Sequence, residues 1–430
     1  MTSLDGTYAQ RDQRAATPAR QAGFDWSGIL NTSVAIMMGL SSIVLIEPAP
    51  YEFLFAIVLF IFVVGGGRVP VILLPLLVLS ITYAAGGFLS LMPHLGNKDA
   101  AQFTLVSAYL LVTAVFFACY VSEQTERRLL VIQNGYIFAA TIAAVAGFLG
   151  YFDIAGLGEH FTLYDRASGT TKDPNVLGTF LVPPLVFILL RFIKGNGTAG
   201  PLALFLLLLF SGAILLCFSR GAWANAAGSV GLMLLLLLFA TTSNALRWRV
   251  LILGTVAVLL LAIGLSIALS FDGMREAFLD RFALQKEYDL GETGRFGNQL
   301  RSIPLLLDRP NGLGPLQFGP LFGEDPHNSF INAFSSYGWI GGISYLVLII
   351  ATWVIGWRLV FLQTPWQTMS IAVWCPTFFT TLQGVQIDTD HWRHLFLLIG
   401  LTWGLFAASV DYQRRHAKMA RAPQPLPPTQ

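Results

Sequence analysis

The residues most able to do chemistry in this chain are arginines and a histidine that stand between long apolar runs. Arg220 is the clearest case, because the turn Ser219-Arg220-Gly221 separates two apolar stretches by only a few residues. An arginine at membrane depth costs free energy unless it finds a partner. Two interpretations stay open: the side chain extends to the lipid headgroups, or its planar guanidinium binds an anion such as pyrophosphate.

A second polar segment, from Arg166 to Asn175, precedes another apolar run. Asp173 followed by Pro174 is typical of a helix start, because proline fits the first helical turn and aspartate caps free N–H groups. These residues alone fit a simple capped turn as well as a ligand-binding loop.

The longest polar segment, residues 272–328, carries Arg295 directly after a glycine. A short helix-like run follows at 300–307, and a turn rich in proline and glycine at 309–314. Earlier in the segment, three apolar residues recur at helical spacing and mark one face: Met274, Phe278 and Phe282. This pattern predicts a short helix that lies on the membrane surface.

The same segment leads into His327-Asn328-Ser329-Phe330, ahead of Gly338 and Gly341. An imidazole titrates near neutral pH, so His327 could accept a proton from a substrate hydroxyl. A lone histidine in a loop can equally be structural, and both interpretations stay open at this point.

A further cluster of titratable residues spans positions 388–394 and contains two carboxylates and two histidines: Asp388, Asp390, His391 and His394. Such a set could hold a divalent cation. We favour the alternative that Asp388 and Arg393 contact substrate or shape the rim of a cavity, with Trp392 in the interfacial aromatic belt. No metal and no other cofactor is expected.

The elements that must position these residues are membrane helices. The chain has 430 residues, 55% hydrophobic and only 12% charged, which excludes a soluble enzyme. A net charge of +2 gives no reason to expect nucleic-acid binding. The apolar runs predict an all-α, polytopic protein with about twelve spans. The predicted spans are 29–46, 51–65, 69–92, 101–121, 129–150, 174–193, 201–218, 222–240, 248–271, 335–361, 366–386 and 394–412.

The distribution of charge predicts the orientation of these spans. More than half of the 26 Lys and Arg residues fall on one side, which the positive-inside rule assigns to the cytoplasm. We expect both termini there: a tail at 1–28 and a basic, Pro-rich tail at 413–430. Spans one to nine occupy 29–271, the periplasmic loop 272–328, and spans ten to twelve 329–412. Five of the six histidines fall outside, so any active site should face the outer side of the membrane.

These segments together resemble the superfamily of O-antigen ligases and Wzy-type O-antigen and exopolysaccharide polymerases. The resemblance covers roughly 160–345, and four motifs carry it in order and on one side. They are Arg166-x-x-Gly169 with Asp173-Pro174-Asn175; the Ser-Arg-Gly turn at Arg220; Arg295 followed by Pro310, Gly312 and Gly314; and His327 to Phe330 with Gly338 and Gly341. Gln299 and Ser336 depart from it, standing where members often have Trp and Glu.

The resemblance implies an inverting, metal-independent glycosyltransferase. Members move a glycan from undecaprenyl pyrophosphate to a sugar hydroxyl at the periplasmic face, in cell-surface polysaccharide assembly. Arg220 and Arg295 would stabilise the departing pyrophosphate, and His327 would take the acceptor proton. Arg166 and Asn328 would contact phosphate or sugar.

The resemblance leaves the acceptor open. A polymerase would extend another lipid-linked glycan and could work with a chain-length regulator; a ligase would attach the glycan to lipid A-core. We slightly favour the polymerase, because the two departures and the lack of an obvious basic groove look less like a ligase. A transporter or flippase for a lipid-linked sugar is the alternative of another class. It predicts charged or broken spans around a midplane cavity, and the sequence shows few ionisable residues in its apolar runs.

Overall fold

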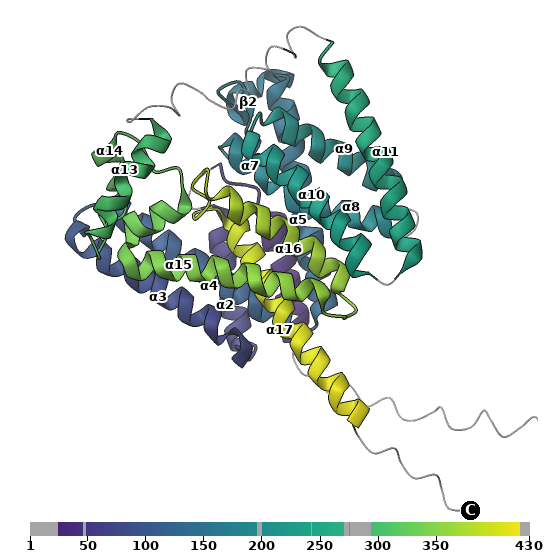
Figure 1. The fold of residues 1–430 in the computed structure, drawn as a ribbon, viewed down its shortest axis with the longest axis horizontal. Coiled ribbons are helices and arrows are strands. Elements are labelled where there is room, and N and C mark those ends of the chain that lie inside the picture. The colour runs from purple at the N-terminus through teal and green to yellow at the C-terminus, as the bar shows by residue number, and fades with distance from the viewer. Residues whose placement is uncertain are drawn as a thin grey trace, which may run out of the picture.

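The computed structural model describes residues 25–45, 49–195, 200–241, 243–270, 275 and 294–421. The predicted surface helix with Met274, Phe278 and Phe282, residues 1–24 and 422–430 of the two tails, and most of the first part of the loop 272–328 lie outside the described residues. Apart from one small hairpin, the described elements are helices (Figure 1). The all-α prediction holds in this part of the chain.

The first group of helices contains α1 (Trp26–Gly39), α2 (Pro50–Val64), α3 (Leu74–Leu91), α4 (Lys98–Ser122) and α5 (Thr125–Tyr151). The 3-10 turns η1 (Val71–Leu73) and η2 (Met92–His94) flank α3. The connection after α5 contains η3 (Ile154–Gly156), α6 (Gly158–Phe161) and an antiparallel hairpin of β1 (Thr162–Leu163) and β2 (Arg166–Ala167), in which Leu163 pairs with Arg166. This hairpin is a small departure from the all-α prediction.

The second group begins with α7 (Pro174–Phe180) and α8 (Val182–Lys194), which are separate because Pro183 and Pro184 interrupt the helix. It continues with α9 (Gly200–Leu216), α10 (Arg220–Ala240) and α11 (Asn244–Ala268). The third group contains α13 (Arg295–Leu307), α14 (Phe318–Phe322), α15 (Ser329–Phe361), α16 (Gln367–Gln383) and α17 (Arg393–Arg421).

Each of the twelve predicted spans coincides with a helix, or with the pair α7 and α8, in the described chain. Seven of the described helical segments are long and apolar enough to cross a membrane by length and composition, and α2 and α9 are shorter apolar helices. The chain therefore has the character of a multi-pass membrane protein. The number of crossings stays a prediction.

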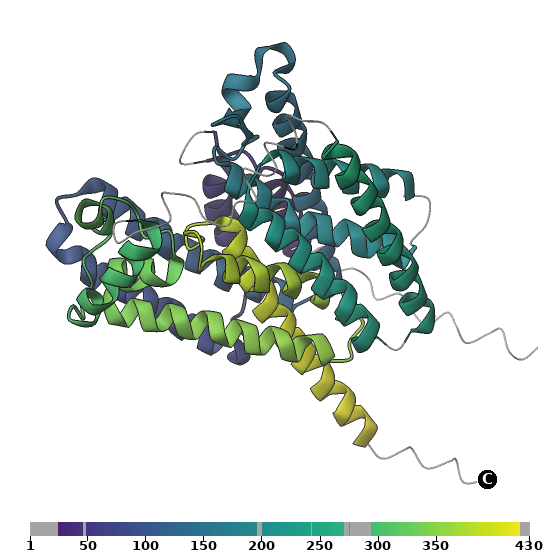
Figure 2. The ribbon, with the colours of Figure 1, turned by 45° about the horizontal axis from the view of Figure 1, so that its top comes forward.

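Helices far apart in the sequence pack side by side. The first and third groups of helices meet where α3 packs against α15 and α4 packs against α17 (Figure 1). The α7–α11 group gathers on the opposite side of the molecule, and α16 joins the two parts through its contacts with α10, α15 and α17 (Figure 2). This arrangement brings the start of α10 close to the segment before α15.

A kink in α15 explains one of the sequence motifs. Gly338 has φ +64° and ψ −164°, which an L side chain rarely adopts. A Cβ atom there would also lie 2.4 Å from the carbonyl oxygen of Pro310. The Pro310–Gly314 turn instead packs into this kink, where Trp339 N donates to Pro310 O at 2.8 Å and Leu313 N to Ser335 O at 2.7 Å. The two motifs thus hold the end of the long loop against α15.

Candidate active site

A cavity of about 210 Å³ brings four of the predicted site residues together. We call it the arginine cavity, because the guanidinium-bearing residues Arg166, Arg220 and Arg295 line it together with His327. The other lining residues are Asn175, Phe218, Ser219, Gly221, Gln383, Gln386 and Ile387. These residues come from five separate parts of the chain: the segment from Arg166 in β2 to Asn175 in α7, the turn before α10, the start of α13, the residue before the cap of α15, and the end of α16.

The Ser-Arg-Gly turn places Arg220 at the first residue of α10. Phe218 takes a left-handed φ of +45°, and the hydroxyl of Ser219 caps the helix by accepting from Ala222 N at 3.3 Å. A Cβ on Gly221 would lie 2.8 Å from Nε2 of Gln383, so α10 and α16 approach too closely here for a side chain. The positive end of the α10 dipole and the Arg220 side chain therefore favour the same cavity for an anion.

Arg166 fixes the neighbouring wall. Its Nε donates to Cys217 O at 2.7 Å, just before the Arg220 turn, and one Nη donates to Oδ1 of Asn175 at 2.9 Å. Asp173 caps α7 as the sequence predicts, because its carboxylate accepts from the N–H groups of Asn175 and Val176. The segment is therefore both a capped helix start and part of the cavity.

Arg295 repeats the arrangement of Arg220, since it is the first residue of α13. One Nη donates to the carbonyl oxygen of His327 at 3.2 Å. The helix begins before the predicted run 300–307, at Arg295 itself, so a second helix N-terminus meets the cavity. Two helix N-termini and three guanidiniums make this a strongly anion-favouring place.

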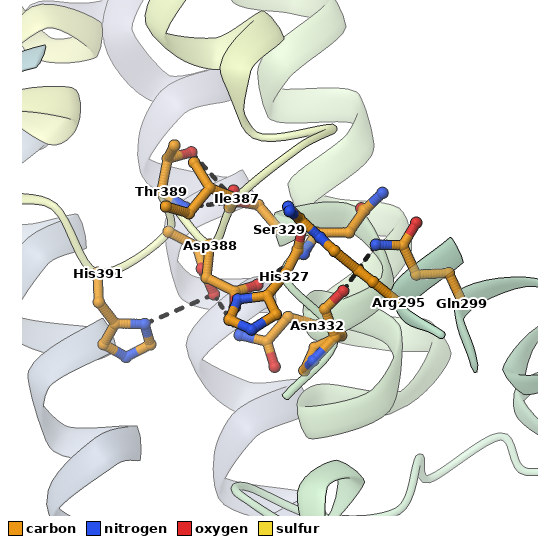
Figure 3. Close-up of polar contacts among 12 residues, drawn as sticks. Arg295, Gln299, His327, Ser329, Asn332, Ile387, Asp388, Thr389 and His391 are labelled. Atoms are coloured by element: carbon orange, nitrogen blue, oxygen red, sulfur yellow. Dashed lines mark hydrogen bonds and ion pairs between the residues drawn. The ribbon is translucent and has the colours of Figure 1, made fainter. Parts of the chain in front are cut away.

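His327 faces a carboxylate that comes from another part of the chain. Its Nδ1 lies 3.7 Å from Oδ2 of Asp388, and the two side chains are 43% and 27% exposed (Figure 3). The backbone of His327 has a left-handed φ of +46°, a conformation that costs free energy in a non-glycine residue and occurs often at functional sites. With Nδ1 toward Asp388, the other ring nitrogen, Nε2, is the one that a substrate hydroxyl could use.

The start of α15 is bonded to the segment 384–390, and this holds the pair in place. Asn328 N donates to Oδ1 of Asp388 at 2.9 Å, and Ser329 N donates to Gly384 O at 2.7 Å. The Ser329 hydroxyl also accepts from Thr389 N at 2.7 Å (Figure 3). The amide of Asn328 caps α15 and donates to Val385 O. These bonds use the amide oxygen twice and one of the two N–H groups, and the substrate contact of Asn328 stays a prediction.

Asp390 and His391 form a second carboxylate–histidine pair. His391 Nδ1 is 3.5 Å from Oδ2 of Asp390, a side chain only 1% exposed, and His391 Nε2 lies 2.9 Å from the Ser107 hydroxyl.

The two pairs influence one another through charge. Burial raises the pKa of Asp388 to about 7, and the negative charge of Asp390 contributes. Burial lowers the pKa of His391, but the hydrogen bond and charge of Asp390 outweigh it and the net shift is upward.

Two glutamines in the arginine cavity were missed at the sequence level. The carbonyl oxygen of Gln383 accepts from Thr179 at 3.1 Å and from Asn225 at 3.0 Å, which orients the amide nitrogen toward Gly221. Gln386 lines the same cavity. The sequence offered one indication of a role for Gln383: a side-chain amide within the apolar run 366–386 needs hydrogen-bond partners inside the membrane.

Arg393 is not part of this cavity. It begins α17, forms an ion pair with Glu52 and lines a second, larger cavity. Asp388 faces His327 and Asp390 faces His391, so the cluster 388–394 is divided. Among the described residues, no three His, Cys, Asp or Glu side chains form a group that could hold a metal ion. The cation alternative therefore has no support in that part of the chain.

Comparison with known proteins adds one finding. Residues 204–346 match the model of the O-antigen ligase family. No curated protein matches the chain. The matched segment runs from α9 into α15 and contains Arg220, Arg295 and His327, whereas Arg166 and Asp388 lie outside it. The resemblance predicted from the sequence is confirmed.

Proposed function

We propose, from the match of residues 204–346 to the O-antigen ligase family, that the arginine cavity transfers a glycan from a polyprenyl pyrophosphate to a sugar hydroxyl. A glycan-transferring role in polysaccharide assembly follows from the family itself. The assignment of donor, leaving group and base depends on one observation. Arg166, Arg220, Arg295 and His327 all line the arginine cavity.

The cavity suits a pyrophosphate leaving group. As the bond between the anomeric carbon and the pyrophosphate oxygen breaks, the electron pair leaves with that oxygen and negative charge grows there. Arg220 and Arg295, each at a helix N-terminus, are already in place to stabilise that charge. Fixed cations of this kind need no reorganisation during the reaction. The bonds of Arg166 to Cys217 and Asn175 give it the additional task of holding the wall.

His327 is the proposed general base. The acceptor oxygen attacks the anomeric carbon while its proton passes to Nε2 of His327. The Asp388 carboxylate orients the ring and stabilises the imidazolium that forms, so Asp388 is a positioning residue. Direct attack from the face opposite the leaving group inverts the anomeric configuration, and no covalent glycosyl–enzyme intermediate is required.

Within this proposal we favour a polymerase acting at the periplasmic face of the inner membrane, with undecaprenyl pyrophosphate as the carrier. Arg393 is the only Arg or Lys among the described residues that line the larger cavity, and Glu52 neutralises it. A phosphorylated lipid A-core would favour several unpaired cations there. Gln299 also differs from the family pattern: its amide donates to Pro326 O at 2.8 Å and so holds the segment before His327.

The glycan profile of a deletion strain tests this choice. Loss of a polymerase should leave single-repeat glycans, and loss of a ligase should leave long chains on the lipid carrier. Reintroduced wild-type protein should restore the normal profile. Restoration by His327→Ala and Arg220→Ala to the wild-type length and amount would exclude the enzyme and leave the transporter alternative.

A further inference from the structure

The larger cavity, of about 860 Å³, has no role in the steps above. We call it the aromatic cavity, because Tyr51, Phe103, Tyr109 and Trp392 are among its lining residues. Its volume lies within the range of about 300–1,000 Å³ that small-molecule sites occupy. Its lining comes mainly from α1, α2, α4, α5, α7 and the start of α17.

Three buried polar atoms belong to the lining side chains and have no hydrogen-bond partner among the described residues. They are Oε2 of Glu52, the hydroxyl oxygen of Tyr109 and Nε2 of His394. Buried polar groups in proteins are nearly always satisfied, and leaving one unpaired costs free energy. Three such atoms around one cavity indicate a ligand with several hydrogen-bonding groups.

The charge of the cavity argues against an anion. Glu52 and Arg393 form an ion pair through Oε1, so the one guanidinium in the described lining is already balanced. A hydrocarbon chain would match the aromatic surfaces but would leave the three polar atoms unsatisfied. A sugar satisfies both requirements, because its hydroxyls can donate and accept while the apolar faces of its ring pack against aromatic side chains.

The aromatic cavity lies directly beside the arginine cavity. Asn175 lines the arginine cavity and the next residue, Val176, lines the aromatic one. Ile387 lines the arginine cavity and His391 lines the aromatic one. These two residues are four positions apart, so their Cα atoms are at most about 14 Å from one another. Except for Leu316, the lining also lies outside the family-matched segment 204–346. The aromatic cavity is thus a feature of this chain's own remaining sequence.

We propose that the aromatic cavity binds sugars of the acceptor glycan that do not react, and that Glu52, Tyr109 and His394 determine which sugars are accepted. This inference depends on the proposed transfer reaction, because a glycan is an acceptor only if that reaction takes place. The reacting hydroxyl lies at His327, and the units next to it extend past the segment 384–392 into the aromatic cavity. If the donor glycan made these contacts instead, the inference would be wrong. The experiment below distinguishes binding of the acceptor glycan from binding of the donor glycan.

Direct binding tests this inference without relying on transfer. Full-length His327→Ala protein is placed in phosphatidylcholine nanodiscs, free of sugar detergents, and titrated with oligosaccharides released from the host's surface polysaccharide. In this background Tyr109→Phe should weaken binding about two- to tenfold, the loss expected for one hydrogen bond. Tyr120→Phe is the matched control, because it removes a hydroxyl on the same helix that is bonded to Asn31 rather than facing the cavity. The control should bind as the parent does.

A second titration uses a lipid pyrophosphate that carries only one sugar, because the full lipid-linked glycan would also be an acceptor for a polymerase. The inference requires that Tyr109→Phe leave its affinity unchanged, because the donor is held by the arginine cavity. Equal weakening of both probes would assign the cavity to the donor glycan and overturn the inference, as would unchanged oligosaccharide binding in Tyr109→Phe and Glu52→Gln. A wild-type protein that binds oligosaccharide and transfers none would refute the proposed function while leaving the sugar site intact.

Discussion

The arginine cavity and the aromatic cavity are neighbours with opposite chemistry. The arginine cavity is small, and three guanidiniums and two helix N-termini surround it. The aromatic cavity is about four times larger, mostly apolar, and its one guanidinium in the described lining is paired with Glu52. The matched family segment supplies Arg220, Arg295 and His327 to the first but only Leu316 to the second. In our proposal, the arginine cavity stabilises the leaving group and the aromatic cavity selects the acceptor.

The segment 384–392 separates these two regions. Its Asp388 faces His327 on one side, and its His391 lines the aromatic cavity on the other. Hydrogen bonds from Asn328 and Ser329 hold the segment against the start of α15. A substitution on one side should therefore change the chemical step, and one on the other side should change acceptor affinity.

The largest effect is expected for His327→Ala. Removing a general base costs about 10²- to 10⁴-fold in rate, and donor binding should remain because the arginines are unchanged. The measurement is turnover and donor affinity of the purified protein. If His327→Ala lost donor affinity while its turnover at saturating donor stayed normal, His327 would bind the donor and would not act as the general base. The proposed division of roles between the two cavities would then be wrong.

The next effect is expected for the arginines. Arg220→Ala and Arg295→Ala should each lower turnover about 10²- to 10³-fold, because each removes a preorganised cation from the leaving group. Arg309→Ala is the matched control: this arginine is exposed, lies shortly after α13 and is not part of the lining. Comparable losses in all three variants would indicate a general effect of charge rather than a cavity.

A moderate effect is expected from pH. His327 needs an ionised Asp388 beside it, and the pKa of Asp388 is raised to about 7. Activity should therefore rise as the pH increases through about 7. Asp390→Asn removes the negative charge that helps to raise this pKa, so the acidic limb of the profile should move to lower pH.

The control for this shift is Asp388→Asn, which should lower activity and abolish that limb altogether. Both variants should be compared by thermal unfolding, since Asp390 is buried and accepts from Asn332 at 2.8 Å. An unchanged limb in both variants would mean that another group controls the profile.

The smallest effect is expected in the aromatic cavity. Tyr109→Phe should raise KM for the acceptor about two- to tenfold and leave kcat close to the wild-type value, because one hydrogen bond to a non-reacting sugar is lost. Tyr120→Phe should change neither constant. A fall in kcat with unchanged KM would move Tyr109 into the chemical step and remove the distinction between the two cavities.

Sequence reasoning identified residues in the arginine cavity because they are polar exceptions in an apolar chain. Arg166, Arg220, Arg295 and His327 all line it. The helix start at Asp173 followed from local capping rules that need no tertiary structure. The same reasoning placed Asp388 and Arg393 together as sugar contacts, and the structure separates them, because Asp388 faces His327 and Arg393 lines the aromatic cavity.

What the sequence did not predict depends on contacts between distant segments. Asp388 reaches His327 only because α15 and α16 pack together, and Glu52 pairs with Arg393 across most of the chain. The contacts of Asn328 show the same limit: its capping bonds are local, but its bond to Val385 joins distant segments. Gln383 was hidden because one amide barely changes the hydropathy of a span.

The stereochemistry of one turnover tests the central claim most directly. Purified protein is given a lipid-pyrophosphate glycan of known anomeric configuration and an oligosaccharide acceptor, and NMR identifies the new glycosidic bond. We predict that each bond formed releases one lipid pyrophosphate, that the anomeric configuration is inverted, and that His327→Ala forms both products about 10²- to 10⁴-fold more slowly. A retained configuration would require a covalent intermediate and would contradict direct attack assisted by His327.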